Sequence, residues 1–141
     1  VNGIDGTLGT ALGLAHRSGL PTFLLTGELA FLHDSNALLF HGQFMGSLTV
    51  FIINNKGGGI FENLPVAEEP EFEKCFATPQ ECNFSLLSGA HGIEFISPST
   101  WEEISGLIQN PIASGVRIIE MKSDRKKDRE TRRRLLSLSP Y

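Results

Sequence analysis

The chain reads PTFLLTGELA over residues 21–30, where an apolar run ends in a short polar turn. Residues 48–59 repeat this design as LTVFIINNKGGG, an apolar run followed by two asparagines, a lysine and three glycines. Both runs have the composition of buried β-strands, and the segment between them is long enough for one helical crossover. The two strands are therefore predicted to lie parallel in one sheet.

Helical and strand patterns alternate along the rest of the chain. A helix is predicted over Thr7–Arg17, with Gly9 and Gly13 on the side that packs closely on the sheet. Further helices are expected to begin after Asp34 or Ser35, after Thr78-Pro79 and after Asn83. Another should begin after Ser99 or Thr100, with Glu102 or Glu103 placed for a capping box. Further strands are expected over 93–96 and 116–121. This order predicts an α/β fold, a three-layer parallel sheet with helices on both faces, formed by residues 1–141 as a single domain.

Two charged segments interrupt this pattern. The acidic, proline-bearing stretch Ala67–Glu73 is interpreted as an exposed excursion. The stretch Asp124–Arg134 holds seven of the twelve basic residues and is predicted to form a helix. Such a helix could touch RNA or an acidic membrane, but a solvated or partner-facing terminal helix is the favoured interpretation. The leucines that follow it could dock onto a neighbouring domain; they are Leu135, Leu136 and Leu138.

Composition excludes several classes of protein. A net charge of −4 argues against a dedicated nucleic-acid binder, which is normally basic. No apolar run approaches the roughly 20 residues that span a bilayer. Cys75 and Cys82 have neither a metal-site nor a redox spacing, so free thiols in a reducing compartment are expected. The expected location is the cytoplasm, or a plastid in a photosynthetic eukaryote, and the opening Val1–Gly6 suggests a fragment of a longer chain.

The polar turns after the two strands form the candidate functional site. Parallel neighbours end at the same edge of a sheet, where open α/β sheets bind ligands. That edge would hold the carboxylate of Glu28, the amide oxygen of Asn55 and glycine backbone, which suit a magnesium ion that also binds phosphate and water. Taken alone, each turn would more often simply end a strand at the protein surface, without binding a ligand. Their combination, one crossover apart, predicts a magnesium-diphosphate site.

These turns also carry a family resemblance. Gly27-Glu28-Leu29, followed after 24 residues by Asn54-Asn55, resembles the signature of thiamine-diphosphate enzymes. The fuller motifs resemble the C-terminal cofactor domain of the MenD-type synthases of menaquinone and phylloquinone biosynthesis, which make 2-succinyl-5-enolpyruvyl-6-hydroxy-3-cyclohexene-1-carboxylate (SEPHCHC). Those motifs are Gly3–Gly6, residues 27–34, residues 54–61, Phe76–Gln80 and Asp124–Lys126.

The resemblance implies a site and an activity. It implies a transferase that decarboxylates 2-oxoglutarate on thiamine diphosphate and adds the succinyl carbanion equivalent to isochorismate. The metal, Mg²⁺ or Mn²⁺, would be held by Glu28, Asn55 and the carbonyl of Gly57. The implied cofactor contacts are Ile4, Asp5, Gly27, Glu28, Leu29, Ala30, Asn55 and Ile60. Phe61 and Leu64 would line the substrate pocket with Ile60, although ordinary core filling is the alternative for these three.

The resemblance further implies a partner. The glutamate that activates the cofactor would lie on a separate pyrimidine-binding domain, usually from another subunit of a homodimer or homotetramer. We therefore expect no catalytic residue within these 141 residues and no synthase activity from the chain alone. Two other hypotheses stay open: the cofactor domain of an acetolactate-synthase-like enzyme or decarboxylase, and a non-catalytic remnant or interaction module.

Overall fold

The computed structural model describes residues 4–138, which form two compact units. Unit 1 comprises residues 4–53 and Asn83–Met121. Unit 2 comprises Asn54–Cys82 and residues 122–138. That the whole chain acts as one cofactor-binding domain stays a prediction.

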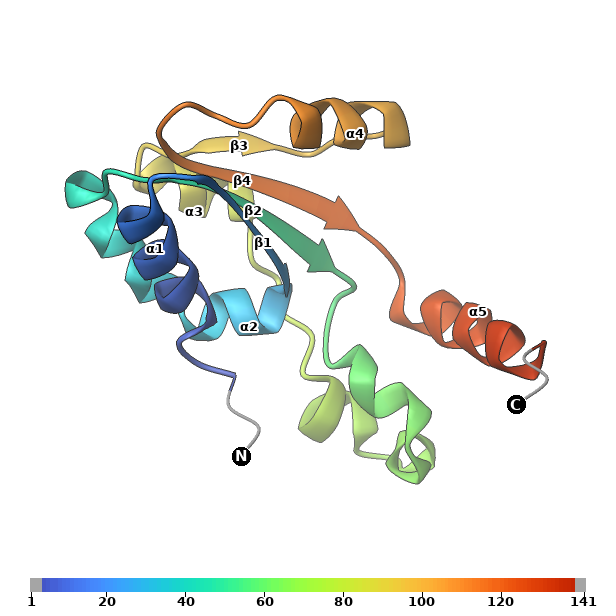
Figure 1. Ribbon diagram of the computed structural model, residues 1–141. Helices are drawn as coiled ribbons and strands as arrows, with labels where there is room; N and C mark the ends of the chain where they lie inside the picture. The colour runs from blue at the N-terminus through green and yellow to red at the C-terminus, as the bar shows by residue number, and fades with distance from the viewer. Residues whose placement is uncertain (1–3, 139–141) are drawn as a thin grey trace. The chain divides into compact units, whose positions relative to one another are not determined.

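Unit 1 is built on a four-stranded sheet (Figure 1). Its strands are β1 (Pro21–Gly27), β2 (Ser47–Asn54), β3 (Glu94–Ile96) and β4 (Gly115–Lys122), in the order β1-β2-β4-β3. β1 pairs with β2 in parallel, and β3 pairs with β4 in parallel. The predicted α/β fold with a parallel sheet is confirmed, and so is the parallel pairing of the first two strands.

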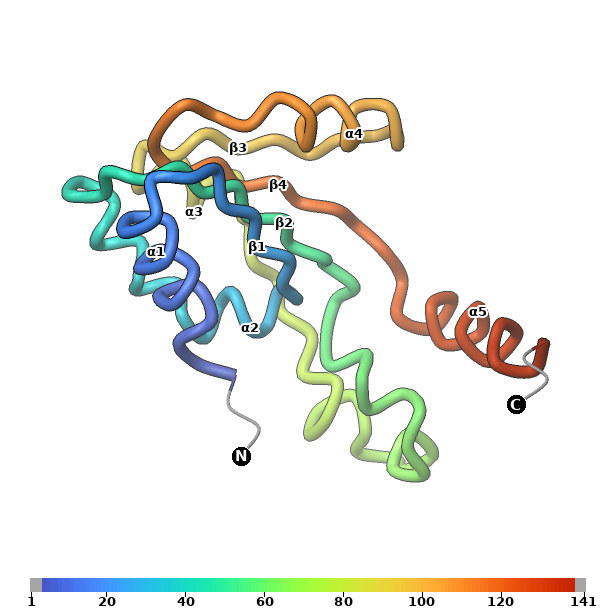
Figure 2. The backbone as a smooth tube through the Cα atoms, in the orientation of Figure 1, coloured from blue at the N-terminus to red at the C-terminus, as the bar shows by residue number. Residues whose placement is uncertain are grey.

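Helices cover both faces of this sheet, as predicted. They are α1 (Thr7–Ser18), α2 (Glu28–His33), the 3₁₀ helix η1 (Ser35–Gln43), α3 (Phe84–Ala90) and α4 (Trp101–Gln109). α1 and α2 lie on one face and α4 on the other (Figure 1). α1 and η1 run side by side, as the backbone trace in Figure 2 shows.

The core of unit 1 lies between the sheet and α1, α2, η1 and α3, whereas α4 contributes no buried residue. β2 is buried along nearly its whole length, as expected for a central strand covered on both faces. α1 contributes a buried stripe of Leu8, Ala11, Leu12 and Ala15. These four residues recur at the spacing of one helical face, so the periodicity of the sequence placed this helix correctly.

The predicted helix starts at Asn83 and Thr100 are confirmed. The side chain of Asn83 accepts a hydrogen bond from the Leu86 amide at 3.0 Å. Thr100 Oγ1 accepts from the Glu103 amide at 3.2 Å, which caps α4. The Glu103 carboxylate completes the box by accepting from the Ser99 amide at 2.6 Å, one residue before the cap.

Other local expectations were wrong. Neither Asp34 nor Ser35 caps η1 with its side chain. The Asp34 carboxylate instead accepts the Gly9 amide at 2.7 Å and so fastens α1. Gly13 has no atom within 4 Å of the Cβ position it lacks, so it is not on a tightly packed side. No helix begins at Thr78-Pro79, because Thr78 ends the preceding helical turn in a left-handed conformation.

Unit 2 consists of short helical turns and one longer helix. The turns are η2 (Gly59–Asn63), η3 (Pro65–Glu68) and the π-helical turn η4 (Glu73–Ala77), and α5 (Arg125–Ser137) packs against η2. The excursion Ala67–Glu73 is largely exposed, as predicted, but Phe72 is buried and stacks on Phe76 with ring centroids 6.2 Å apart. No helix among residues 4–138 is long and apolar enough to cross a bilayer.

Candidate metal and cofactor site

In unit 1, the predicted site residues follow the carboxyl end of β1. The parallel register places Gly27 opposite Ile53, so β1 and β2 end at the same edge. Gly27 has an extended conformation and caps α2, and Glu28 is the first residue of that helix. Glu28 is only 3% exposed, which is unusual for a carboxylate. Leu29 and Ala30 follow in the first turn and are half-buried.

Ile4 and Asp5 lie in the exposed segment that leads into α1. Gly3, which opens their motif, lies outside the described residues. An exposed isoleucine in this segment is consistent with the predicted contact to a cofactor, which stays a prediction.

In unit 2, the predicted site residues form a tight turn after β2. The Lys56 amide donates to Asn54 Oδ1 at 3.2 Å, and Lys56 has a left-handed conformation with φ of 60°. The Oδ1 atom of Asn55 is buried and has no hydrogen-bond partner among the described residues. A buried acceptor without a partner is costly, so this oxygen is suited to a cation or a donor from outside the chain.

Two glycines of this turn are required by the protein's own backbone, and the third by the Asn55 side chain. A Cβ on Gly57, where φ is 132°, would lie 2.4 Å from the Ala77 carbonyl oxygen. A Cβ on Gly58 would lie 2.6 Å from the Phe76 carbonyl oxygen. A Cβ on Gly59 would lie 2.6 Å from Asn55 Nδ2, so this glycine keeps space for the Asn55 side chain. The Gly58 amide also donates to the Ala77 carbonyl at 2.6 Å, which fixes the turn against that segment.

Arg125 contacts the turn that holds Asn55, a role that sequence reasoning did not assign to it. Its Nε donates to Glu62 Oε1 at 2.7 Å, and its two terminal nitrogens donate to the Lys56 carbonyl and to Glu73. The Arg125 side chain is 10% exposed and that of Glu62 is 4% exposed. Burial alone would lower the pKa of Arg125, but hydrogen bonds to Glu62 and Glu73 raise it above its ordinary value. Arg125 therefore stays charged.

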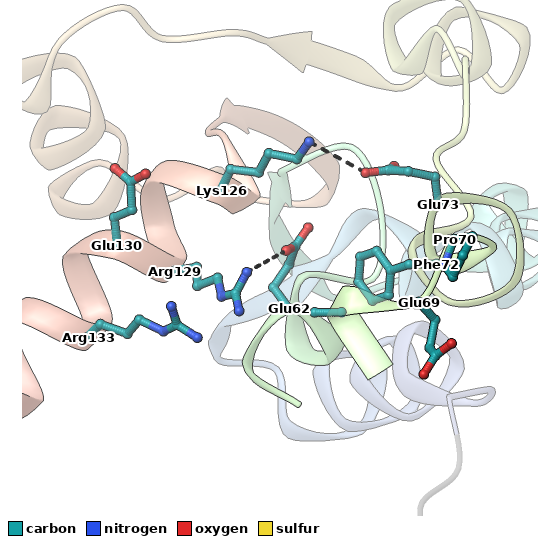
Figure 3. A pocket seen from close by; sticks show the side chains of 10 residues that line it. Glu62, Glu69, Pro70, Phe72, Glu73, Lys126, Arg129, Glu130 and Arg133 are labelled. Carbon is teal, nitrogen blue, oxygen red and sulfur yellow. Dashed lines mark ion pairs between the residues drawn. The ribbon is translucent and has the colours of Figure 1, made fainter. Parts of the chain in front are cut away.

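A charged pocket lies beside this network within unit 2. It has a volume of about 440 Å³ and lies between α5 and the acidic segment. Two ion pairs cross it, Arg129 to Glu62 at 3.8 Å and Lys126 to Glu73 at 3.6 Å (Figure 3). α5 is therefore not wholly solvated: its first two turns pair with Glu62 of η2 and with Glu73. Leu135, Leu136 and Leu138 are exposed.

The three apolar residues after the glycines lie at the surface. Ile60 is 74% exposed, Leu64 is half exposed, and Phe61 is partly exposed with its ring edge-on to Phe76. Ile60 and Leu64 therefore fill no core among the described residues, whereas Phe61 packs against Phe76. Their contact with a substrate or cofactor stays a prediction.

The donor set determines which metal would fit. No group of three or more His, Cys, Asp or Glu side chains that could hold a metal occurs among residues 4–138. Within unit 2, the buried Asn55 amide oxygen and the backbone carbonyls of the turn are hard oxygen donors of the kind that magnesium binds. Cys75 is exposed and carries a free thiol, as expected.

The chain is similar to known synthases over most of its length. It is 48% identical over 137 residues to the 2-succinyl-5-enolpyruvyl-6-hydroxy-3-cyclohexene-1-carboxylate synthase of Thermosynechococcus vestitus, covering 96% of this chain and 24% of that protein. The synthase of the same name from Trichodesmium erythraeum is 50% identical over 129 residues, covering 91% and 22%. That of a Synechococcus species is 52% identical over 132 residues, covering 93% and 22%.

The chain thus spans about a quarter of the length of the curated relatives it matches. No protein-family model matches it. Identity near 50% across more than nine-tenths of the chain leaves no doubt about common ancestry. This chain is homologous to a portion of the 2-succinyl-5-enolpyruvyl-6-hydroxy-3-cyclohexene-1-carboxylate synthases.

Proposed function

We propose that this chain is the magnesium- and thiamine-diphosphate-binding part of a SEPHCHC synthase. The observation that carries the proposal is the Oδ1 atom of Asn55, buried and without a hydrogen-bond partner among the described residues. A magnesium ion would give this oxygen the partner it lacks. Homology to synthases of that name supports the same conclusion independently.

Each proposed ligand has a stated role. Glu28 supplies the negative charge that a divalent cation requires, and Asn55 Oδ1 and the Gly57 carbonyl supply neutral oxygens. The remaining ligands would come from the diphosphate and water. Backbone amides of Leu29 and Ala30 would donate to the diphosphate oxygens, since amides bind anions well where they are not paired within a helix.

The other site residues would shape the organic part of the cofactor. Ile4 would press against the cofactor and keep it bent, with Asp5 beside it. Ile60, Phe61 and Leu64 are apolar and accessible, so they would exclude water from the reacting carbon. Thiamine diphosphate, when bound, would supply a nucleophilic carbon for a 2-oxo acid and a group that delocalises the charge left by decarboxylation.

The complete enzyme would use 2-oxoglutarate and isochorismate in menaquinone or phylloquinone biosynthesis. It would pair this part with a pyrimidine-binding domain that carries the activating glutamate, across a homodimer or homotetramer. The chain alone should therefore form no product from the two substrates. A turnover assay with thiamine diphosphate and Mg²⁺ checks this, and product formation would contradict it.

Cofactor binding is tested by calorimetry on the 141-residue chain. Thiamine diphosphate should bind only when Mg²⁺ is present. Asn55→Ala should weaken this binding about 10-fold or more, because it removes a ligand oxygen. Asn36→Ala is the matched control, since Asn36 is exposed and lies outside the proposed site. Binding without the metal, or equal affinity in both variants, would refute the proposal.

A further inference from the structure

The start of α5 is attached to the turn that holds Asn55. The Ser123 amide donates to the Asn54 carbonyl at 2.9 Å. Arg125 donates to the Lys56 carbonyl. The carbonyl groups on both sides of Asn55 are therefore held by residues almost seventy positions away in the sequence, within the same unit.

These hydrogen bonds hold a turn whose backbone conformation is energetically unfavourable. Lys56 has a left-handed conformation at φ of 60°, which costs a residue with a side chain about 1 kcal/mol or more. Gly57 follows at φ of 132°. A backbone in this state persists only where neighbouring contacts determine it, and the Arg125 hydrogen bond falls on the carbonyl between these two residues.

The guanidinium of Arg125 is itself held rigidly. Glu62 is buried and accepts from its Nε, and Glu73 accepts from one terminal nitrogen. The planar group thus has three acceptors in a fixed fork, which a lysine could not satisfy at once. α5 is capped by Asp124, whose carboxylate accepts the amides of Lys126 and Lys127 at 3.0 and 3.1 Å.

We propose that Arg125 is a positioning residue: it holds the Asn55–Gly57 turn so that Asn55 Oδ1 and the Gly57 carbonyl are set to bind Mg²⁺. The inference rests on the proposed function, because it concerns the metal ligands assigned there. Arg125 would not touch the metal or the cofactor. Its effect passes through the Lys56 carbonyl.

Two variants test this in the 141-residue chain. Arg125→Lys keeps a charge near Glu62 but cannot bridge all three acceptors. The double variant Arg125→Met with Glu62→Gln removes both charges of the buried ion pair. Neither charge is then left buried without its partner, so the variant guards against simple unfolding. Arg132→Gln is the matched control, because it removes one positive charge from an exposed position of the same helix.

Two quantities are measured at a temperature where circular dichroism shows every variant folded. The first is hydrogen exchange of peptides covering residues 54–62. The second is the affinity for Mg²⁺ in the presence of thiamine diphosphate. Both Arg125 variants should exchange faster and bind Mg²⁺ about 10-fold or more weakly, and the control should match the unaltered chain.

The outcomes separate the two claims. If the unaltered chain binds Mg²⁺ and the Arg125 variants bind it equally well, Arg125 has only a structural role and this inference is wrong, while the proposed function stands. If the unaltered chain binds no Mg²⁺ with thiamine diphosphate, the proposed function fails and the inference falls with it.

Discussion

Replacement of Gly57 by alanine should destabilise unit 2 severely. Alanine at φ of 132° is strained, which costs about 1–3 kcal/mol. Its Cβ would also lie 2.4 Å from the Ala77 carbonyl oxygen and 3.2 Å from the Ala77 carbonyl carbon, and backbone there cannot move as a flexible side chain could. Overpacking of this kind costs a further ~1–3 kcal/mol. The expected loss of stability is therefore about 2–6 kcal/mol, the sum of both costs.

Hydrogen exchange of peptides from residues 54–82 and 122–138 measures this loss, because it reports the opening free energy of unit 2 separately. Gly13→Ala is the control: Gly13 lies within α1, and nothing is within 4 Å of its missing Cβ. That change should be neutral or stabilise the protein by up to about 1 kcal/mol, because alanine is the better helix former. Equal exchange in both variants would show that the turn yields freely and would refute the reasoning.

Two further predictions concern single hydrogen bonds. Thr100→Ala removes the cap of α4 and should cost about 1 kcal/mol, measured by urea unfolding with Thr100→Ser, which keeps the capping hydroxyl, as the control. The hydrogen bond from Arg125 lowers the pKa of Glu73 below its ordinary value of 4.5. The stability that this pair supplies is therefore complete above pH 4.5 and is lost as the pH falls through the lowered pKa of the folded state. Glu73→Gln should flatten the acid dependence of exchange in unit 2, and an unchanged slope would contradict the assignment.

The sequence was sufficient for most of the fold of unit 1. The strands at 21–27 and 47–54 are apolar and bounded by turn residues, and α1 has a clear helical period, so local pattern and tertiary packing agree there. The pattern failed where a contact is non-local. Asp34 resembles a helix cap in sequence, but its carboxylate accepts an amide from Gly9, 25 positions away. The glycines at 57–59 resemble a ligand loop, yet the nearest obstacles to a side chain there include the backbone at Phe76 and Ala77.

The candidate site also combines residues that local sequence patterns predict with one that only a non-local contact reveals. Glu28 and Asn55 could be singled out because oxygen-bearing residues directly follow parallel strands, which is a local signal. Arg125 belongs to the Asp124–Lys126 motif but could be given no role, because it is one of seven basic residues in a segment whose composition indicates a solvated helix. Arg125 differs from the other basic residues because it pairs with Glu62. A buried carboxylate requires a cation, and the fold brings the Arg125 Nε to 2.7 Å from Glu62, which is 63 positions away in the sequence. Once that pair forms, the guanidinium has donors left for the Lys56 carbonyl, so one buried ion pair determines both the packing of α5 and the shape of the turn that presents Asn55.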